Sequence, residues 1–252
     1  MKEDIRLVVN PSVPEELRSA MERVVREGMG PEAELIYDGG RNRLWVEKVK
    51  PEPSGSQGVV TEMNVKAFGL PKFPNSLIYG VFRKSKAQRS YEHAMRLLQL
   101  GFDTPQPMGY AEVRVAGSAL LRRSFYFSAQ LPWPNMRFWE SDKDYDHLRD
   151  AWGAEIARLH QAGVWMKDHS AGNILRHRDD NGHWHFAYVD LNRMAFGVTD
   201  EHRLMKMFKS VSTALEFTVA LARSYALAAG KDPDKAASMA EKIYRRFNRR
   251  KH

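Results

Sequence analysis

Residues 165–177, WMKDHSAGNILRH, place an acid and an amide, Asp168 and Asn173, five residues apart, followed at once by the apolar Ile174 and Leu175. Two interpretations fit this pattern. One is an ordinary polar turn between a helix and a strand, in which Asp and Asn satisfy backbone amides. The other is the part of a phosphoryl-transfer site that holds a base and a metal ion. Other parts of the chain must supply the partners that the second interpretation requires.

The segments on either side of this stretch predict a mainly helical C-terminal part. Residues 144–163 carry an apolar stripe and end at Gly163, which is typical of a helix with a left-handed cap. Residues 173–178 and 183–191 are strand-like and flank Asp-Asp-Asn-Gly, a turn sequence that favours a β-hairpin. From about Asp200 onward the pattern is helical.

The N-terminal part predicts strands and one helix. Three segments rich in Val, Leu, Ile and aromatic residues predict strands at 34–40, 43–49 and 58–68, with a Pro/Gly/Ser loop at 48–58. A helical pattern at 85–101 ends at Gly101, where a left-handed cap is expected. Two further strands are predicted at 104–115 and 119–131.

This order of elements predicts an α+β fold with two lobes and a cleft between them. The β-rich N-terminal lobe with one main helix is expected at 1–131, and the mainly helical C-terminal lobe at 132–252. A chain of 252 residues is long enough for either one large domain or two lobes of this size.

Composition limits the classes of function. The chain is 43% hydrophobic and 28% charged, as in an ordinary globular protein, and it has no cysteine, which excludes disulfides, thiolate metal sites and cysteine nucleophiles. The first residues lack the pattern of a signal peptide. The most apolar later stretch, from Ala214, contains Glu216 and Arg223, so it is too polar to span a bilayer. We therefore expect a cytoplasmic protein.

The formal net charge of +8 favours a polyanionic partner or an anionic membrane face. Much of the excess lies in residues 241–252, EKIYRRFNRRKH, where Ile243, Tyr244 and Phe247 supply apolar positions at helical spacing. Peripheral binding of an amphipathic helix to the inner face of a membrane is one interpretation. A solvated terminal helix is the other.

Phosphoryl transfer from ATP needs a cation on the phosphates, oxygen ligands for Mg²⁺ and a carboxylate that orients the attacking hydroxyl. Lys66, in an otherwise apolar strand, needs an anionic partner if it is buried, and Glu92 on the next helix is a suitable one. Asp168 is the candidate carboxylate. Asn173 and Asp190, at the two ends of the predicted hairpin, are the candidate magnesium ligands. Each of these residues, taken singly, is also explained as a solvated or capping residue.

Other motifs are less specific. Gly39 and Gly40 would let the backbone approach a phosphate, although a ligand-free hairpin turn explains them nearly as well. His183 and His185 alternate on a strand without a third metal ligand nearby, so we interpret them as surface or packing residues. The sequence has no Gly-x-x-x-x-Gly-Lys-Ser/Thr loop. The aromatic run 124–139 suggests stacking on nucleic acid bases, but a strand and hinge at the lobe junction explains it more simply, so no nucleic acid partner is expected.

Three segments together, 85–110, 159–175 and 188–194, resemble the lipopolysaccharide kinase family, the WaaP-like Kdo and heptose kinase group of the protein-kinase-like superfamily. The resemblance extends from about Ile36 to Arg193 and weakens after Asp200. It implies a protein-kinase-like fold and transfer of the γ-phosphoryl group of ATP to a sugar hydroxyl of the lipopolysaccharide core.

The resemblance also implies a role for each site residue. Lys66 and Glu92 match the lysine and its helix partner, Asp168 the catalytic-loop aspartate, and Asn173 and Asp190 the magnesium ligands. Gly39 and Gly40 match the phosphate-covering turn, and Tyr126 and Ala129 lie in the hinge at 125–131 that would contact adenine.

The sequence departs from the protein-kinase pattern in three places. Met166-Lys167-Asp168 replaces His-Arg-Asp, Asp190-Leu191-Asn192 replaces Asp-Phe-Gly, and no Ala-Pro-Glu segment follows. The absence of the Ala-Pro-Glu segment favours a constitutive kinase of a small molecule or a glycolipid over a regulated protein kinase. Two alternatives stay open: a kinase of a small soluble alcohol, like aminoglycoside and choline kinases, and a pseudokinase that binds nucleotide without transfer.

Overall fold

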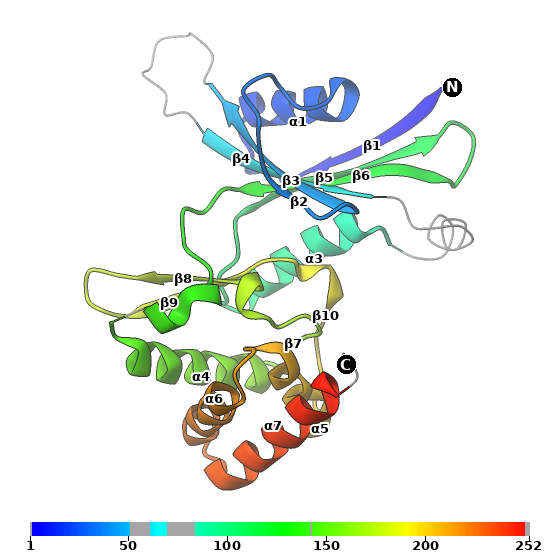
Figure 1. Ribbon diagram of the computed structural model, residues 1–252. Coiled ribbons are helices and arrows are strands. Elements are labelled where there is room, and N and C mark those ends of the chain that lie inside the picture. The colour runs from blue at the N-terminus through cyan, green and yellow to red at the C-terminus, as the bar shows by residue number, and fades with distance from the viewer. Residues whose placement is uncertain (1, 51–60, 70–83, 142, 250–252) are drawn as a thin grey trace. The chain divides into compact units, whose positions relative to one another are not determined.

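A computed structural model describes residues 2–50, 61–69, 84–141 and 143–249 (Figure 1). The chain forms two compact units: residues 1–97 with 105–132, and residues 98–104 with 133–252. The first is built on a β-sheet and the second is mainly helical, which confirms the predicted α+β class. Most of the predicted loop at 48–58 lies outside the described residues.

The first unit contains a six-stranded antiparallel sheet with the order β1-β5-β6-β4-β3-β2. Its elements in chain order are β1 (Glu3–Val9), α1 (Glu15–Glu27), β2 (Glu34–Asp38), β3 (Asn42–Val49), β4 (Thr61–Phe68), α3 (Lys86–Gln99), β5 (Pro107–Val115) and β6 (Leu121–Ala129). The predicted strands and the predicted helix at 85–101 are all present. Gly101, with φ +77°, has the left-handed conformation expected after that helix.

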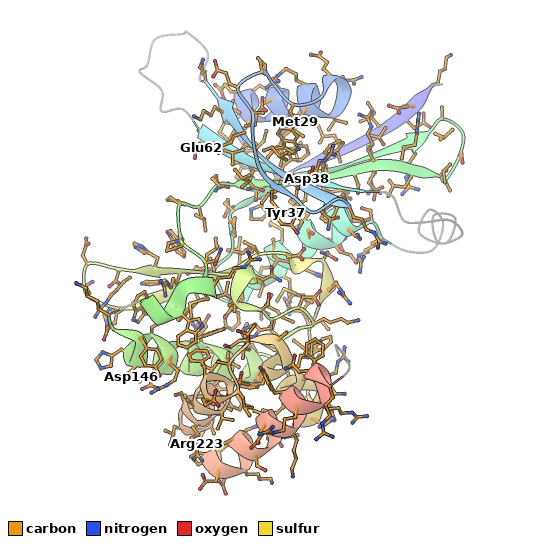
Figure 2. The ribbon with its side chains drawn as sticks, viewed as in Figure 1. Met29, Tyr37, Asp38, Glu62, Asp146 and Arg223 are labelled. Atoms are coloured by element: carbon orange, nitrogen blue, oxygen red, sulfur yellow. The ribbon has the colours of Figure 1, made fainter. Side chains whose placement is uncertain are left out.

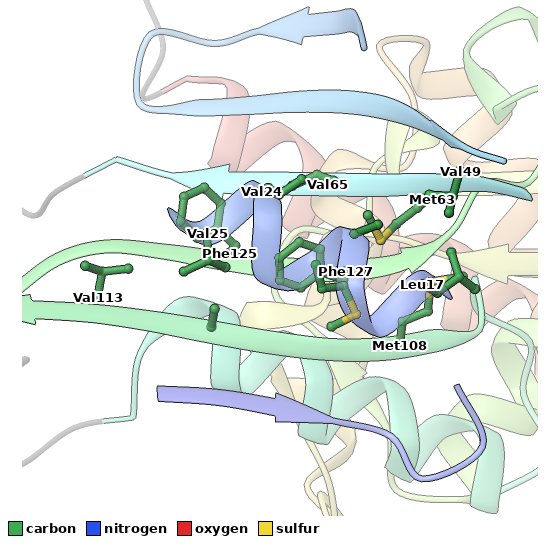
Figure 3. Close-up of a cluster of buried hydrophobic side chains, with 13 residues drawn as sticks. Leu17, Val24, Val25, Val49, Met63, Val65, Met108, Val113, Phe125 and Phe127 are labelled. Carbon is green, nitrogen blue, oxygen red and sulfur yellow. The ribbon is translucent and has the colours of Figure 1, made fainter. Parts of the chain in front are cut away.

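One helix covers each face of this sheet (Figure 1). Because side chains alternate along a strand, Met63 and Val65 of β4 point to the α1 face, while Lys66 points to the α3 face. Figure 3 shows the core on the α1 face, where the buried Leu17 and Val24 of α1 pack in one cluster with strand residues such as Phe127. Burying this continuous apolar surface stabilises the sheet by about 25 cal/mol per Å².

Strand β1 and helix α1 were not predicted. The segment EELRSAMERVVRE has the apolar spacing of an amphipathic helix, since Leu17, Ala20, Met21, Val24 and Val25 are its buried residues. Strand β1 pairs with β5 from Glu3 opposite Val115 to Val9 opposite Gly109. A Cβ on Gly109 would lie 2.4 Å from the carbonyl oxygen of Val8, so this close strand approach needs glycine.

The second unit is built on helices with two short β-pairings. Its elements are η1 (Met136–Ser141), α4 (Tyr145–Gln161), β7 (Trp165–Met166), η2 (Ala171–Asn173), β8 (Ile174–Arg178), β9 (Trp184–Tyr188), η3 (Leu191–Arg193), β10 (Met194–Ala195), α5 (Glu201–Met205), η4 (Lys206–Ser210), α6 (Leu215–Ala228) and α7 (Pro233–Asn248). The predicted helix, hairpin and helical C-terminal part are all present. Gly163, with φ +67°, lies just beyond α4, as expected.

Candidate active site

The loop that contains Asp168 is closed by hydrogen bonds to the main-chain oxygen of Asp168. The side-chain amide of Asn173 (Nδ2) donates to this oxygen at 2.8 Å, and the Ser170 N–H donates to it at 2.9 Å. The predicted spacing of five residues therefore corresponds to a turn whose two ends are tied together. The amide nitrogen of Asn173 is thus used in the turn.

Asn173 and Asp190 flank the open end of the β8–β9 hairpin. Ile174 is opposite Tyr188 in the register, and the Val189 N–H donates to the carbonyl oxygen of Asn173 at 3.0 Å. Asp190 is the next residue, so the hairpin brings the two predicted magnesium ligands to one place. A carboxylate and an amide oxygen are donors that suit Mg²⁺, which commonly takes one or two protein oxygens and completes its shell with phosphate and water.

Asp190 has an unusual backbone conformation. It is the one non-glycine residue with a positive φ, 59°, among those the structure describes. Asp and Asn tolerate this left-handed region better than other side chains, and strained backbones cluster at functional sites. Its carboxylate oxygen Oδ1 accepts a hydrogen bond from Asn192 Nδ2 at 2.8 Å. Asn192 is buried, so it fixes the orientation of the carboxylate.

The carboxylate of Asp168 forms an ion pair with Arg193. The Arg193 Nη1 lies 3.2 Å from Oδ1 and 2.8 Å from Oδ2. Both side chains are partly exposed, so the pair contributes at most about 1 kcal/mol. The turn also depends on the next residue, His169, which is fully buried between the rings of Trp152 and Tyr188.

In the sheet unit, Lys66 lies on β4 opposite Leu44 on one side and Tyr126 on the other. Its Nζ is 5.5 Å from the centre of the Phe68 ring. The carboxylate of Glu92 accepts hydrogen bonds from Lys84 Nζ at 2.8 and 2.9 Å and from Gln88 Nε2 at 3.0 Å. The cation on Glu92 in this structure is therefore that of Lys84, and a pair with Lys66 stays a prediction.

Gly39 and Gly40 form the turn between β2 and β3, beside Tyr37 and Asp38 (Figure 2). The Gly39 N–H donates to the Asn42 oxygen at 3.0 Å, and the Gly40 N–H to Asp38 Oδ1 at 2.9 Å. The Arg41 N–H donates to the Gly39 oxygen at 2.8 Å. All three amides are thus used within the turn, and these amides can bind a phosphate only after the turn changes conformation. Gly40 has φ +70°, which requires glycine or a residue that tolerates the left-handed region.

The two predicted adenine contacts lie on β6. The Tyr126 side chain is buried, and burial raises the pKa of its phenol well above the usual value. The Ala129 N–H donates to the Gln106 oxygen at 2.9 Å, so this amide is already bonded. Next to Ala129 lies a hollow of about 640 Å³, lined among the described residues by Lys48, Thr61, Glu62, Ala129 and Gln130. Adenine binding at this edge of the sheet stays a prediction.

The basic C-terminal segment is helix α7, and its apolar residues pack on its own unit. The Tyr244 hydroxyl donates to the Thr213 oxygen, and Lys209 Nζ lies 5.6 Å from the centre of the Phe247 ring. These contacts hold Tyr244 and Phe247 half-buried against their own unit, while Lys242, Arg245 and Arg246 are exposed. Among the described residues, no helix combines the length and the apolar composition needed to span a bilayer.

The aromatic and histidine residues that the sequence singled out are used internally. Trp133 stacks on His177 at 5.0 Å and Trp139 on Phe217 at 3.7 Å between ring centres. Residues His183 and His185 both contact the Asp179 carboxylate at the hairpin turn. Hydrogen bonds from His185 and from backbone amides lower the pKa of Asp179 to about 2. These contacts agree with the interpretation of the two histidines as surface or packing residues: His183 is exposed and His185 half-buried.

Three residues of this site were missed by the sequence prediction: Arg193, Asn192 and His169. Each lies within three residues of a predicted site residue in the sequence. That closeness is no signal of a role in the site, because turn residues without such a role lie equally close. Their roles follow from tertiary contacts, because Arg193 meets Asp168 across 25 residues through the pairing of β7 with β10.

No protein-family model and no curated protein sequence matches the chain. Among solved structures, WaaP in complex with acyl carrier protein is similar over 97% of this chain and 98% of that chain, with a TM-score of 0.58 and 14% identity. Two structures of the Rio2 kinase from Chaetomium thermophilum, one an ADP/Mg²⁺-phosphoaspartate complex, cover 93% and 97% of this chain and 75% and 83% of theirs. Their TM-scores are 0.46 and 0.48, at 17% and 15% identity. The likeness to WaaP confirms the protein-kinase-like fold that the sequence resemblance implied.

Proposed function

We propose that this chain is an ATP- and magnesium-dependent kinase that transfers the γ-phosphoryl group to a sugar hydroxyl of lipopolysaccharide core, on Kdo or heptose, or of a similar glycolipid. One observation carries the proposal. Within a unit of this fold, the β8–β9 hairpin brings Asp190 next to Asn173, whose side chain is bonded to the loop of Asp168 at 2.8 Å. A polar turn without a catalytic function would still be closed by the hydrogen bond from Asn173 to the Asp168 main-chain oxygen. Such a turn would not need the carboxylate of Asp190 beside it.

The residues divide the chemistry between them. Asp168 would orient the acceptor hydroxyl and take its proton as the oxygen attacks phosphorus, which is the usual role of a carboxylate in phosphoryl transfer. Asn173 and Asp190 would hold magnesium, which neutralises the charge on the phosphates when it is bound. In the sheet unit, the Lys66 ammonium would bind phosphate oxygens and Glu92 would hold that ammonium in place. Gly39, Gly40, Tyr126 and Ala129 would contact the nucleotide, as the resemblance implies.

The acceptor places the reaction at the cytoplasmic side of the inner membrane, where a glycolipid core with free hydroxyls is accessible. Since Tyr244 and Phe247 of α7 pack on the protein, any peripheral membrane contact would be electrostatic, through exposed cations such as Lys242 and Arg246. Such binding to anionic vesicles should decline steeply with salt.

The test is transfer of label from γ-labelled ATP to a panel of acceptors: core oligosaccharide fragments that contain Kdo or heptose, aminoglycosides, choline and buffer alone. We expect magnesium-dependent labelling of a core fragment. Asp168→Asn should reduce it by about 10² to 10⁴, because general base catalysis contributes that much. Asp180→Asn, an exposed residue at the far end of the same hairpin, is the matched control and should leave the rate unchanged.

The panel separates the alternatives. Labelling of an aminoglycoside or choline in place of core fragments would indicate a soluble-alcohol kinase. Magnesium-dependent ADP binding without labelling of any acceptor would favour a pseudokinase. Unchanged labelling in Asp168→Asn would show that the base is elsewhere.

A further inference from the structure

Four basic residues lie close together beside Asp168, because Lys167, Arg193 and Lys206 all lie close enough to Lys209 to act on its charge, as does Asp168. Two of them come from the pairing of β7 with β10, where Met166 is opposite Met194. The Lys167 N–H donates to the Arg193 oxygen at 3.4 Å, so these two residues lie side by side. Arg193 Nη1 is 2.8 Å from the Asp168 carboxylate, and both Lys167 and Arg193 are exposed.

The other two come from η4. The Ser210 hydroxyl donates to the oxygen of His169 at 3.3 Å, which holds the end of η4 against the residue that follows Asp168. Lys209 therefore lies near the Asp168 loop, and Lys206 is one turn earlier. Lys209 is half-buried, and its Nζ lies 5.6 Å from the centre of the Phe247 ring of α7.

Positive charge exceeds negative charge around Lys209. Burial lowers the pKa of Lys209; Asp168 opposes this shift, while Lys167, Arg193 and Lys206 add to it. Among the charges that act most strongly on Lys209, Asp168 is thus the one anion, and it is already paired with Arg193. Bringing like charges together on a partly buried lysine is unfavourable in the absence of an anion and becomes favourable when one binds.

We propose that Lys167, Arg193, Lys206 and Lys209 form an acceptor subsite that binds a carboxylate or phosphate group carried by the acceptor, close to the hydroxyl that Asp168 orients. Lys209 is its central residue, positioned by Phe247, so helix α7 forms part of the subsite. This inference rests on the proposed function, because it assumes that Asp168 faces an acceptor. It narrows the acceptor to an anionic sugar and makes a neutral sugar a poor substrate.

The first test is binding to the full chain without nucleotide. Glucuronate, glucose 6-phosphate and glucose are titrated at low salt, and binding is followed by chemical-shift changes in NMR spectra. We expect the two charged sugars to bind at least tenfold more tightly than glucose, and this advantage to shrink as salt rises. Glucuronate and glucose 6-phosphate separate a preference for carboxylate from one for phosphate.

Substitutions then locate the subsite. Lys209→Met, which removes the charge and keeps an unbranched apolar chain beside Phe247, should weaken binding of the charged sugars at least fivefold and leave glucose unchanged. Lys209→Arg should restore it to within about twofold, since the charge is kept. Lys242→Met, an exposed lysine of α7, is the matched control. Charged sugars that bind no better than glucose, or equal binding in Lys209→Met and Lys242→Met, would overturn the proposal.

A second measurement distinguishes this subsite from nucleotide binding and from the kinase hypothesis. If Lys209→Met weakens ADP binding as much as glucuronate binding, the cations hold nucleotide phosphates and the acceptor subsite is wrong. If ADP binding is unchanged and the acceptor is labelled, Lys209→Met should raise the acceptor KM and leave the ATP KM unaltered. If charged sugars bind through Lys209 but none is ever labelled, the anion site stands and the proposed kinase function fails.

Discussion

The Val189 N–H donates to the carbonyl oxygen of Asn173 at 3.0 Å, and this bond extends the β8–β9 ladder by one step beyond Ile174 and Tyr188. The bond holds Asn173, the residue before β8, against Val189, the residue after β9. Asp190 follows Val189, so the hairpin holds the backbones of Asn173 and Asp190 close to each other before any ligand binds. Preorganisation of this kind avoids the free-energy cost of ordering ligands during binding.

Asp190→Asn should weaken magnesium binding, because it removes the carboxylate charge, without unfolding the protein. Asparagine tolerates the left-handed backbone at φ 59°, so the free energy of unfolding should change by less than about 0.5 kcal/mol. Asp190→Ala should lose about 1 kcal/mol or more from backbone strain. In both variants the magnesium concentration that gives half-maximal label transfer should rise more than about tenfold. An unchanged magnesium dependence in Asp190→Asn would remove this residue from the metal site.

Glu47→Ala should destabilise the protein more than removal of a similar surface acid. Glu47 is 3% exposed; its Oε1 accepts from Arg23 Nη2 at 2.6 Å and its Oε2 from the Gly30 N–H at 3.1 Å. Loss of these bonds should cost roughly 2–4 kcal/mol, because the Gly30 amide loses its partner and the charged pair is broken. Urea unfolding measures the change. Glu32→Ala, which removes an exposed pair with Lys50 at 2.9 Å, is the control and should have no measurable effect.

The sequence predicted the elements that carry strong periodicity. Helix α4 buries Leu148, Trp152, Ile156 and Leu159, the stripe from which it was predicted, and the hairpin turn at Asp-Asp-Asn-Gly lies between β8 and β9. In these segments local propensity and tertiary packing favour the same structure. Helix α1 was not predicted, although its apolar spacing is regular; most of its residues are charged, and its apolar residues form a core face only by packing on the sheet.

The sequence could predict those features of the site that depend on local order, but not the contacts between residues that are distant in the sequence. The five-residue spacing of Asp168 and Asn173 and the position of Asp190 at a strand end follow from local order, so the sequence could place them together. The ion pair of Asp168 with Arg193 depends on the pairing of two-residue strands, β7 and β10, which leave almost no pattern in the sequence. The pairing of Glu92 with Lys84 likewise depends on which of several lysines is nearest in the fold.

Gly153→Ala should destabilise the contact of α4 with α6. A Cβ at this position would lie 2.6 Å from the Cβ of Ser224 and 2.7 Å from the backbone nitrogen of Tyr225. Overpacking against a helix backbone costs about 1–3 kcal/mol, which outweighs the roughly 1 kcal/mol that alanine gains over glycine inside a helix. Thermal unfolding should therefore show a lower Tm.

Gly172→Ala is the matched control for Gly153→Ala. Its Cβ would also meet an atom at 2.6 Å, but that atom is the Arg137 Nε, near the end of a flexible side chain that can move away. We expect a much smaller change in Tm. An equal loss in both variants would mean that the α6 backbone is no more rigid than the Arg137 side chain.

Two buried histidines should make the protein less stable in acid. Burial, with a smaller contribution from Lys231, lowers the pKa of His160 to about 4, and burial, with a contribution from His160, lowers that of His169 to about 3. In the unfolded chain both titrate near 6.5. Between pH 6.5 and about 4 the unfolded state binds protons that the folded state does not, so the free energy of unfolding falls as the pH is lowered. The slope should reach about 1.4 kcal/mol per pH unit for each histidine.

Urea unfolding at pH 7.0, 6.0 and 5.0 measures this slope. His160→Gln removes one titrating group and should flatten the dependence below pH 6.5, even if the variant is less stable at pH 7 through loss of the contact of Nε2 with the Met207 sulfur at 3.2 Å. His202→Gln, at an exposed position of α5, should keep the native slope. If His160→Gln and the native chain lose stability in parallel from pH 7 to pH 5, His160 gains its proton over the same pH range in the folded and the unfolded chain, and burial does not lower its pKa.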